Sequence, residues 1–104
     1  MSELDPGQFL GVPSPGEQNA DAVILPLPME KTVSCGKGTG GAPKAILAAG
    51  LQVETFDEET LLDFADPPRV HTAEPLPDED DVEKYLVAVR HRAEELRGTF
   101  LLGL

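Results

Sequence analysis

The fold class of this chain is decided by residues 22–28, which read Ala22-Val23-Ile24-Leu25-Pro26-Leu27-Pro28. An unbroken apolar run that contains β-branched residues and no charge is typical of a strand covered on both faces in a parallel sheet. Pro26 and Pro28 mark the end of that strand, because proline cannot donate to the hydrogen-bond ladder of a central strand. The run therefore predicts an α/β protein with a mostly parallel sheet.

Glycine and proline divide the chain that follows this strand. Residues 32–41 contain too many glycines for regular structure, and residues 42–50 predict a short helix. Pro43 suits the first helical turn, where its missing N–H has no intrahelical partner, and Gly50 suits a left-handed exit from the helix. Apolar and polar residues then alternate over residues 51–56, which predicts a strand with one wet face near a sheet edge.

The second half of the chain predicts two further strands and a longer helix. Residues 69–72 lie between proline-rich segments and predict a short strand. From Asp78 the pattern predicts a helix of about five turns, which Gly98 stops, with acidic residues at its positive end and arginines near its negative end. Residues 99–104 predict a buried parallel strand. The apolar stripe of the predicted helix consists of Val82, Tyr85, Leu86, Val89, Ala93 and Leu96.

Two regions follow from this pattern. Residues 1–20 are rich in proline and glycine and predict an irregular arm, which can dock but forms no regular element. Residues 21–104 predict the α/β domain. A buried strand that follows a helix normally continues into a polar turn and another covering element, so we expect the chain to be physically incomplete.

Composition limits the partners of this chain. Its 104 residues, 40% hydrophobic and 26% charged, suit one compact domain with a small aliphatic core. Nineteen acidic and eight basic side chains give a net charge of −11, which repels nucleic acids and anionic membrane surfaces. No secretory signal or long apolar run is present, so we expect a cytoplasmic protein. The lone Cys35 excludes an internal disulfide and a multi-cysteine zinc site.

The glycine-rich loop is the main candidate for ligand contact. Gly36 to Gly41 matches the G-x-G-x-x-G pattern of dinucleotide-binding proteins, but Pro28 to Cys35 separates these glycines from the strand that they should follow directly. A loop with left-handed positions is therefore favoured over a nucleotide site. The loop nevertheless leaves the carboxyl end of the first strand, where ligands gather in open α/β sheets. Ser34, Lys37 and Gly38 are accordingly the candidates for the rim of an active site.

The sequence predicts no catalytic residue and no metal ligand in this chain. His71 and His91 do not form a metal constellation, because they lie in separate segments. The acidic runs at residues 57–59 and 78–81 lack the glycine and the spacing of a calcium loop, and capping of the following helix explains the second run. Cys35 has no histidine or redox partner nearby in the sequence.

The order of these elements resembles the start of the ureohydrolase family, and agmatinases most closely. In that family a first strand that ends in proline leads to a glycine loop with Thr or Ser, a Gly-Thr pair, a Gly-Pro helix start and a strand that ends near Tyr-Asp-Glu-Glu. The matching segments are Ala22–Pro28, Thr32–Thr39, Ala42–Ile46 and Val53–Glu59. The resemblance runs to Leu104 and covers the leading part of a family domain.

This chain departs from the family pattern at three positions. Ala42 replaces the usual glycine before the proline, Gly41 stands where a bulkier residue is common, and Phe56 replaces the frequent tyrosine. These differences concern the subfamily, because the order and spacing of the segments are kept.

The resemblance implies a three-layer αβα fold of the arginase and deacetylase type and a cytoplasmic, homo-oligomeric enzyme, trimeric or hexameric. It also implies two manganese ions that lower the pKa of a bridging water, whose hydroxide attacks a guanidinium carbon. A complete agmatinase would thereby convert agmatine to putrescine and urea in polyamine biosynthesis. The first manganese ligand of the family lies in a Gly-Gly-Asp/Glu-His-Ser segment that would follow Leu104. We therefore expect residues 1–104 alone to be inactive.

Three alternative functions are kept open. The complete protein can be arginase-like or another guanidino hydrolase instead of an agmatinase. The chain can also be a stand-alone, non-catalytic binding or interaction module, which should fold cooperatively by itself. A nucleotide-binding βαβ unit, the weakest alternative, predicts a thermal shift with NAD or ATP.

Overall fold

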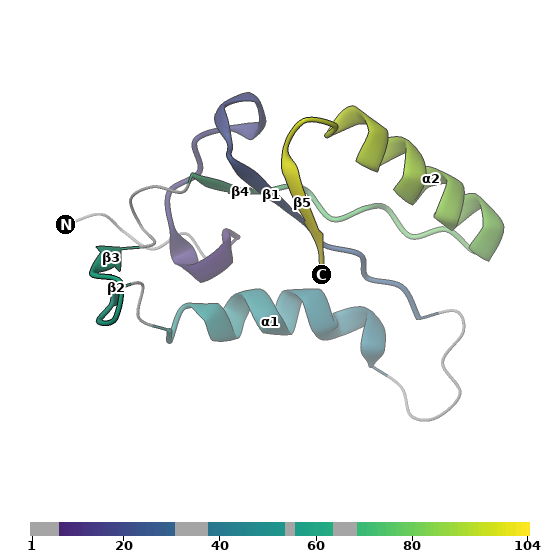
Figure 1. Cartoon of the computed structure of the whole chain (residues 1–104). Coiled ribbons are helices and arrows are strands. Elements are labelled where there is room, and N and C mark those ends of the chain that lie inside the picture. The colour runs from purple at the N-terminus through teal and green to yellow at the C-terminus, as the bar shows by residue number, and fades with distance from the viewer. Residues whose placement is uncertain (1–6, 31–37, 54–55, 64–68) are drawn as a thin grey trace.

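The centre of the protein is a small parallel sheet. The computed structural model describes residues 7–30, 38–53, 56–63 and 69–104 (Figure 1). Within these ranges the sheet has the strands β1 (Ala22–Leu25), β4 (Val70–Thr72) and β5 (Phe100–Gly103), in the order β4-β1-β5, and both pairings are parallel. The prediction of an α/β fold with a parallel sheet is confirmed.

β1 is the central strand of this sheet. Val23 pairs with His71 on one side and with Leu101 on the other. The exposed fractions of Val23 and Leu25 are 0% and 1%, as the unbroken apolar run predicts for a strand that is covered on both faces. The strand ends before Pro26, whose ring removes the donor that would continue the ladder.

Helix α2 (Val82–Glu95) connects β4 to β5 and covers one face of the sheet. Asp81 caps the helix: its carboxylate accepts hydrogen bonds from the backbone N–H groups of Glu83, at 2.9 Å, and Lys84, at 3.5 Å. Capping by the acidic run is thus confirmed. Leu96, just after the helix, packs with Val23 and Leu25 in the core.

The predicted apolar stripe of α2 is only partly buried. Tyr85 and Leu96 are 2% and 3% exposed, but Leu86 is 56% exposed. Leu86 belongs to the exposed part of the stripe, because the sheet beneath α2 is too narrow in the described residues to cover the full width of the helix.

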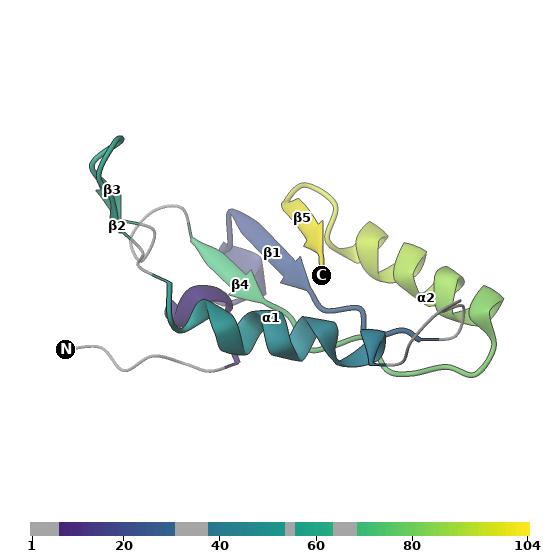
Figure 2. The same ribbon diagram turned by 90° about the horizontal axis from the view of Figure 1, so that it is seen from below.

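Helix α1 (Ala42–Gly50) lies on the opposite side of the strands from α2 (Figure 2). Its bounds confirm the predicted helix, and Pro43 stands in its first turn. The predicted left-handed exit at Gly50 was wrong: Gly50 is the last helical residue and is not among the residues with positive φ. A close approach explains the glycine instead, because a Cβ there would lie 3.3 Å from the backbone nitrogen of Leu10.

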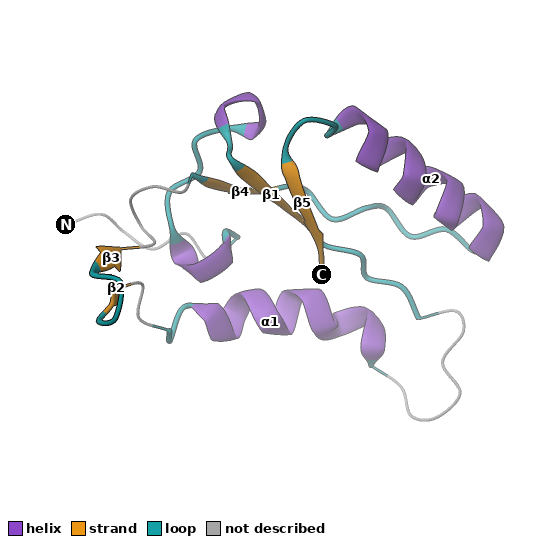
Figure 3. Cartoon of the chain, in the orientation of Figure 1, coloured by secondary structure: helices purple, strands orange, loops and turns teal. Residues whose placement is uncertain are grey.

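The strand predicted over residues 51–56 was wrong for residues 51–53; residues 54–55 lie outside the described residues, and Phe56 begins a short strand. The backbone N–H of Val53 donates to the carbonyl of Gly50, so the chain continues to turn after α1. Val53 is 56% exposed and finds no core to face. An antiparallel hairpin of β2 (Phe56–Asp57) and β3 (Leu62–Asp63) follows instead, and it belongs to a separate sheet (Figure 3).

The amino-terminal arm docks on the outer edge of β4. It contains two single-turn 3-10 helices, η1 (Phe9–Gly11) and η2 (Glu17–Asn19). The side-chain amide of Gln8 accepts from the N–H of Thr72 at 2.9 Å and donates to its carbonyl at 3.4 Å, as a neighbouring strand would do. Ser14 Oγ lies 2.6 Å from His71 Nδ1 in the same region. Side chains of the arm therefore satisfy backbone hydrogen-bonding groups at this edge of the sheet.

The opposite edge strand, β5, is much more exposed than predicted. Phe100 is 70% exposed and Leu102 is 43% exposed, so the prediction of a buried strand was wrong for this face. Both side chains lie on the face that Ile24 shares, because they pair with Ala22 and Ile24 in the register.

An ion pair between Glu17 and Arg92 links the arm to α2 and makes stability sensitive to acid. The hydrogen bond from Arg92 holds the pKa of Glu17 below its ordinary value of 4.5, although partial desolvation opposes this. The unfolded chain therefore binds the proton more readily, and the pair stabilises the fold fully above pH 4.5 and progressively less as pH falls through the folded pKa.

We expect Glu17→Gln to lower the free energy of unfolding by at most about 1 kcal/mol at neutral pH, because the pair is partly exposed. The difference from the unchanged protein should shrink below pH 4.5. Urea denaturation from about pH 6 to about pH 3 measures this difference. A stability difference that stays constant over that pH range would contradict a stabilising ion pair between Glu17 and Arg92.

Candidate functional site

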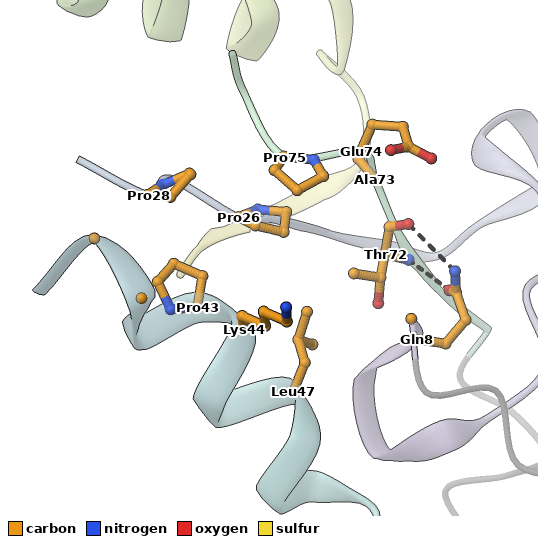
Figure 4. Close-up of a pocket in the computed structure, with 13 residues that line it drawn as sticks. Gln8, Pro26, Pro28, Pro43, Lys44, Leu47, Thr72, Ala73, Glu74 and Pro75 are labelled. Atoms are coloured by element: carbon orange, nitrogen blue, oxygen red, sulfur yellow. Dashed lines mark hydrogen bonds between the residues drawn. The ribbon is translucent and has the colours of Figure 1, made fainter. Parts of the chain in front are cut away.

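A pocket of about 650 Å³ opens beside the carboxyl ends of β1 and β4 (Figure 4). Ligands of open α/β sheets bind outside the carboxyl ends of the strands, where the loops leave the sheet. The pocket has this position because Pro26 and Pro28 follow β1 and the segment Ala73–Pro75 follows β4. Its volume suits a small metabolite.

The first wall consists of the strand ends. Pro26 is fully buried and Ala73 is 4% exposed, so the base of this wall is apolar and well packed. Two backbone hydrogen bonds fix it: Ala73 N–H donates to the carbonyl of Ile24 at 2.8 Å, and Leu76 N–H donates to that of Pro26 at 3.1 Å. The wall thus continues the β1–β4 pairing beyond the strands.

The second wall is the start of α1. Gly40 and Gly41 lead into the helix, and Pro43, Lys44 and Leu47 face the pocket from its first two turns. Pro43 and Leu47 are buried, whereas Lys44 is exposed. This wall is therefore apolar at its base, with an ammonium group toward solvent.

The third wall comes from the arm. Gly7 and Gln8 line the pocket, and the Gln8 amide is held by the backbone of Thr72. Thr72 Oγ1 accepts from the N–H of Phe9 at 2.7 Å. These bonds fix the arm where it borders the pocket.

The charged side chains that line the pocket lie at its edges. Lys44 and Glu74 are the charged side chains among the described residues that line it. In Figure 4 the Glu74 carboxylate points away from α1, while the Lys44 side chain extends along the helix wall. The interior between them is lined by prolines and Leu47. Such a pocket can take a ligand with an aliphatic middle and polar ends.

The predicted rim residues are placed only in part. Ser34 and Lys37 lie outside the described residues, as does Cys35. Gly38 is described, and its φ of 111° confirms a left-handed position in the glycine loop. Gly38 does not line the pocket, but Gly40 and Gly41 of the same run do.

The histidines do not come together. His71 lies on β4 and is hydrogen-bonded to Ser14 of the arm, whereas His91 lies exposed on α2. Among the residues that the structure describes, no group of three or more His, Cys, Asp or Glu side chains is placed to hold a metal ion. Nor is any helix in the described ranges long and apolar enough to cross a bilayer.

Sequence reasoning missed several residues of the pocket. Gln8 and Gly7 belong to the arm, and nothing in the arm's own pattern indicated that it would dock beside α1. Lys44 and Leu47 were assigned to a helix without a role. The useful signal was the pair of prolines at Pro26 and Pro28, since a strand that stops abruptly leaves space at its carboxyl end.

Comparisons with models of protein families, with curated proteins and with solved structures returned no match to this chain.

Proposed function

We propose that residues 21–104 form the leading part of an agmatinase-like ureohydrolase domain, whose complete form hydrolyses a guanidino C–N bond to release urea. The observation that carries this proposal is the pocket at the carboxyl ends of β1 and β4, with the glycine run on its wall. The order strand, glycine loop and proline-started helix is the order on which the ureohydrolase resemblance rests.

The architecture supports the same proposal. α1 and α2 lie on opposite sides of a parallel sheet, which is the arrangement of an αβα fold. Phe100 and Leu102 leave apolar surface on β5 that a wider sheet with further helices would cover. We therefore propose the arginase and deacetylase type of fold for the complete domain.

The described residues do not supply the manganese site that such an enzyme needs. No suitable donor set is present among them, so no step at the metal is assigned to this chain. Two manganese ions, held by other parts of the domain, would supply the hydroxide. The pocket residues would hold and orient the substrate: the apolar walls suit a methylene chain, and the Glu74 carboxylate is the group that would attract a cationic end, whereas the Lys44 ammonium would repel one.

The proposal predicts that the 104-residue chain binds agmatine weakly in this pocket. We expect saturable amide shifts in NMR titrations at Gly40, Gly41 and Thr72, with a Kd of the order of 1 mM. NAD and ATP should produce no shift. Agmatine shifts that are absent, or that lie elsewhere, would contradict the proposed site.

A pair of matched variants tests the location. Gly41 has a φ of −88°, and a Cβ there meets nothing within 4 Å, so Gly41→Phe should fold and obstruct the pocket. Ala45→Phe places the same ring on the exposed side of the same helix. We expect Gly41→Phe to weaken agmatine binding at least about tenfold and Ala45→Phe to leave it unchanged.

A further inference from the structure

The carboxylate of Glu30 bridges two backbone amides of the glycine run. Its Oε1 accepts hydrogen bonds from Gly38 N–H and from Gly40 N–H, the second at 3.3 Å. Glu30 follows β1 and the pocket residue Pro28, whereas the glycines precede α1. One side chain thus ties together the two segments from which two walls of the pocket are built.

The backbone at this point is shaped to receive an anion. Gly38 has a left-handed φ of 111°, and the 3-10 turn η3 (Thr39–Gly41) begins directly after it. The amide of a left-handed residue and the amides directly after it can converge on one point and form a concavity that binds anions. Because Glu30 already fills this concavity, the amides of Gly38 and Gly40 are not offered to a nucleotide, although the run matches the G-x-G-x-x-G pattern.

The contact also sets the separation of the walls. A Cβ on Gly40 would lie 3.5 Å from Glu30 Cβ and 3.9 Å from the carbonyl oxygen of Pro28. The glycine therefore packs directly on the segment after β1. Without the carboxylate, the amides of Gly38 and Gly40 would lose their acceptor. The glycines that lead into the second wall would then no longer be bonded to the segment that follows β1.

We propose that Glu30 is a positioning residue for the pocket. By binding the amides of Gly38 and Gly40, it holds the lining residues Gly40 and Gly41 in the positions that admit the ligand. This inference rests on the proposed function, since it gives the pocket a ligand. Glu30 itself does not line the pocket, so its effect on affinity is exerted through Gly40 and Gly41.

The test compares agmatine binding to the full chain and to Glu30→Ala, with Glu58→Ala, an exposed carboxylate in the β2–β3 turn, as the matched control. We expect Glu30→Ala to raise the Kd at least about tenfold, since hydrogen bonds to a charged group are lost, and Glu58→Ala to leave it unchanged. Formate or acetate should partly restore the affinity of Glu30→Ala, because a small carboxylate can occupy the vacated amides. Chloride at equal ionic strength should not.

Glu30→Gln keeps the length of the side chain and one acceptor oxygen, so its affinity should lie between those of the other two proteins. If Glu30→Ala does not fold, the comparison of Glu30→Gln with the unchanged chain decides the question. Equal affinity in the folded variants, or no rescue by carboxylates, would overturn the role of Glu30 and leave the proposed function intact.

A chain that binds no agmatine at all would overturn the proposed site instead. Hydrogen exchange separates this case from the first, because it needs no ligand. The amide protons of Gly38 and Gly40 should exchange more slowly in the unchanged chain than in Glu30→Ala or Glu30→Gln. Equal exchange rates would show that the carboxylate does not hold these amides and would overturn the inference.

Discussion

Tyr85→Ala is expected to lower the free energy of unfolding by about 3–5 kcal/mol, whereas Tyr85→Phe is expected to leave it unchanged or raise it by up to about 1 kcal/mol. Tyr85 is 2% exposed and is the largest fully buried side chain described in the chain. Loss of its ring leaves a cavity beneath α2. A domain of this size has only about 5–15 kcal/mol to lose, so the alanine variant should be largely unfolded under mild denaturing conditions.

The phenylalanine variant isolates the hydroxyl of Tyr85. Within the described residues this buried oxygen has no hydrogen-bond partner. Burial raises the pKa of the phenol above its ordinary value of 10.0, and the charge of Asp78 adds to this. Removal of a buried, unpaired polar group breaks no hydrogen bond, and it removes the free-energy cost of burying that group.

Urea denaturation of the two variants measures both effects, with Val87→Ala as the control on the same helix. Val87 is 66% exposed, so its truncation should change stability by less than about 0.5 kcal/mol. If Tyr85→Phe lowered stability by more than about 1 kcal/mol, the hydroxyl would have a partner that the described contacts do not include.

Local patterns predicted the elements whose sequence and packing agree. The apolar run of β1 matches its place in the centre of the sheet, and Asp81 has the chemistry that its capping position requires. The prediction of a strand failed at residues 51–53 because alternation alone does not supply a sheet to pair with. At Val53 the turns that follow α1 prevailed over the alternating pattern.

The site was predictable in position but not in composition. The end of β1 at Pro26 indicated where a ligand site would open, because the position follows from one strand. The walls depend on contacts across long distances in the sequence, such as Gln8 with Thr72, which no periodicity encodes. The role of Glu30 was missed for the same reason: a glutamate outside any element carries no local pattern.

The second large effect concerns catalysis. If the proposed function is right, residues 1–104 are expected to release no urea from agmatine in the presence of manganese, because the proposal assigns every metal ligand to other parts of the domain. If the coding sequence continues in frame past codon 104 into a Gly-Gly-Asp/Glu-His-Ser segment, the longer protein should release urea. Enzymes accelerate reactions by at least about a millionfold, so the longer protein should exceed a metal-only blank by several orders of magnitude.

The variants of the pocket connect this assay to the structure. In the longer protein Gly41→Phe should suppress urea release, because the substrate would lose its place beside β1 and β4, while Ala45→Phe should not. Turnover by residues 1–104 alone would contradict the proposal, since these residues would then have to hold the metal themselves. A stop codon after codon 104 would contradict it too, and cooperative folding of the chain would then favour a stand-alone binding module.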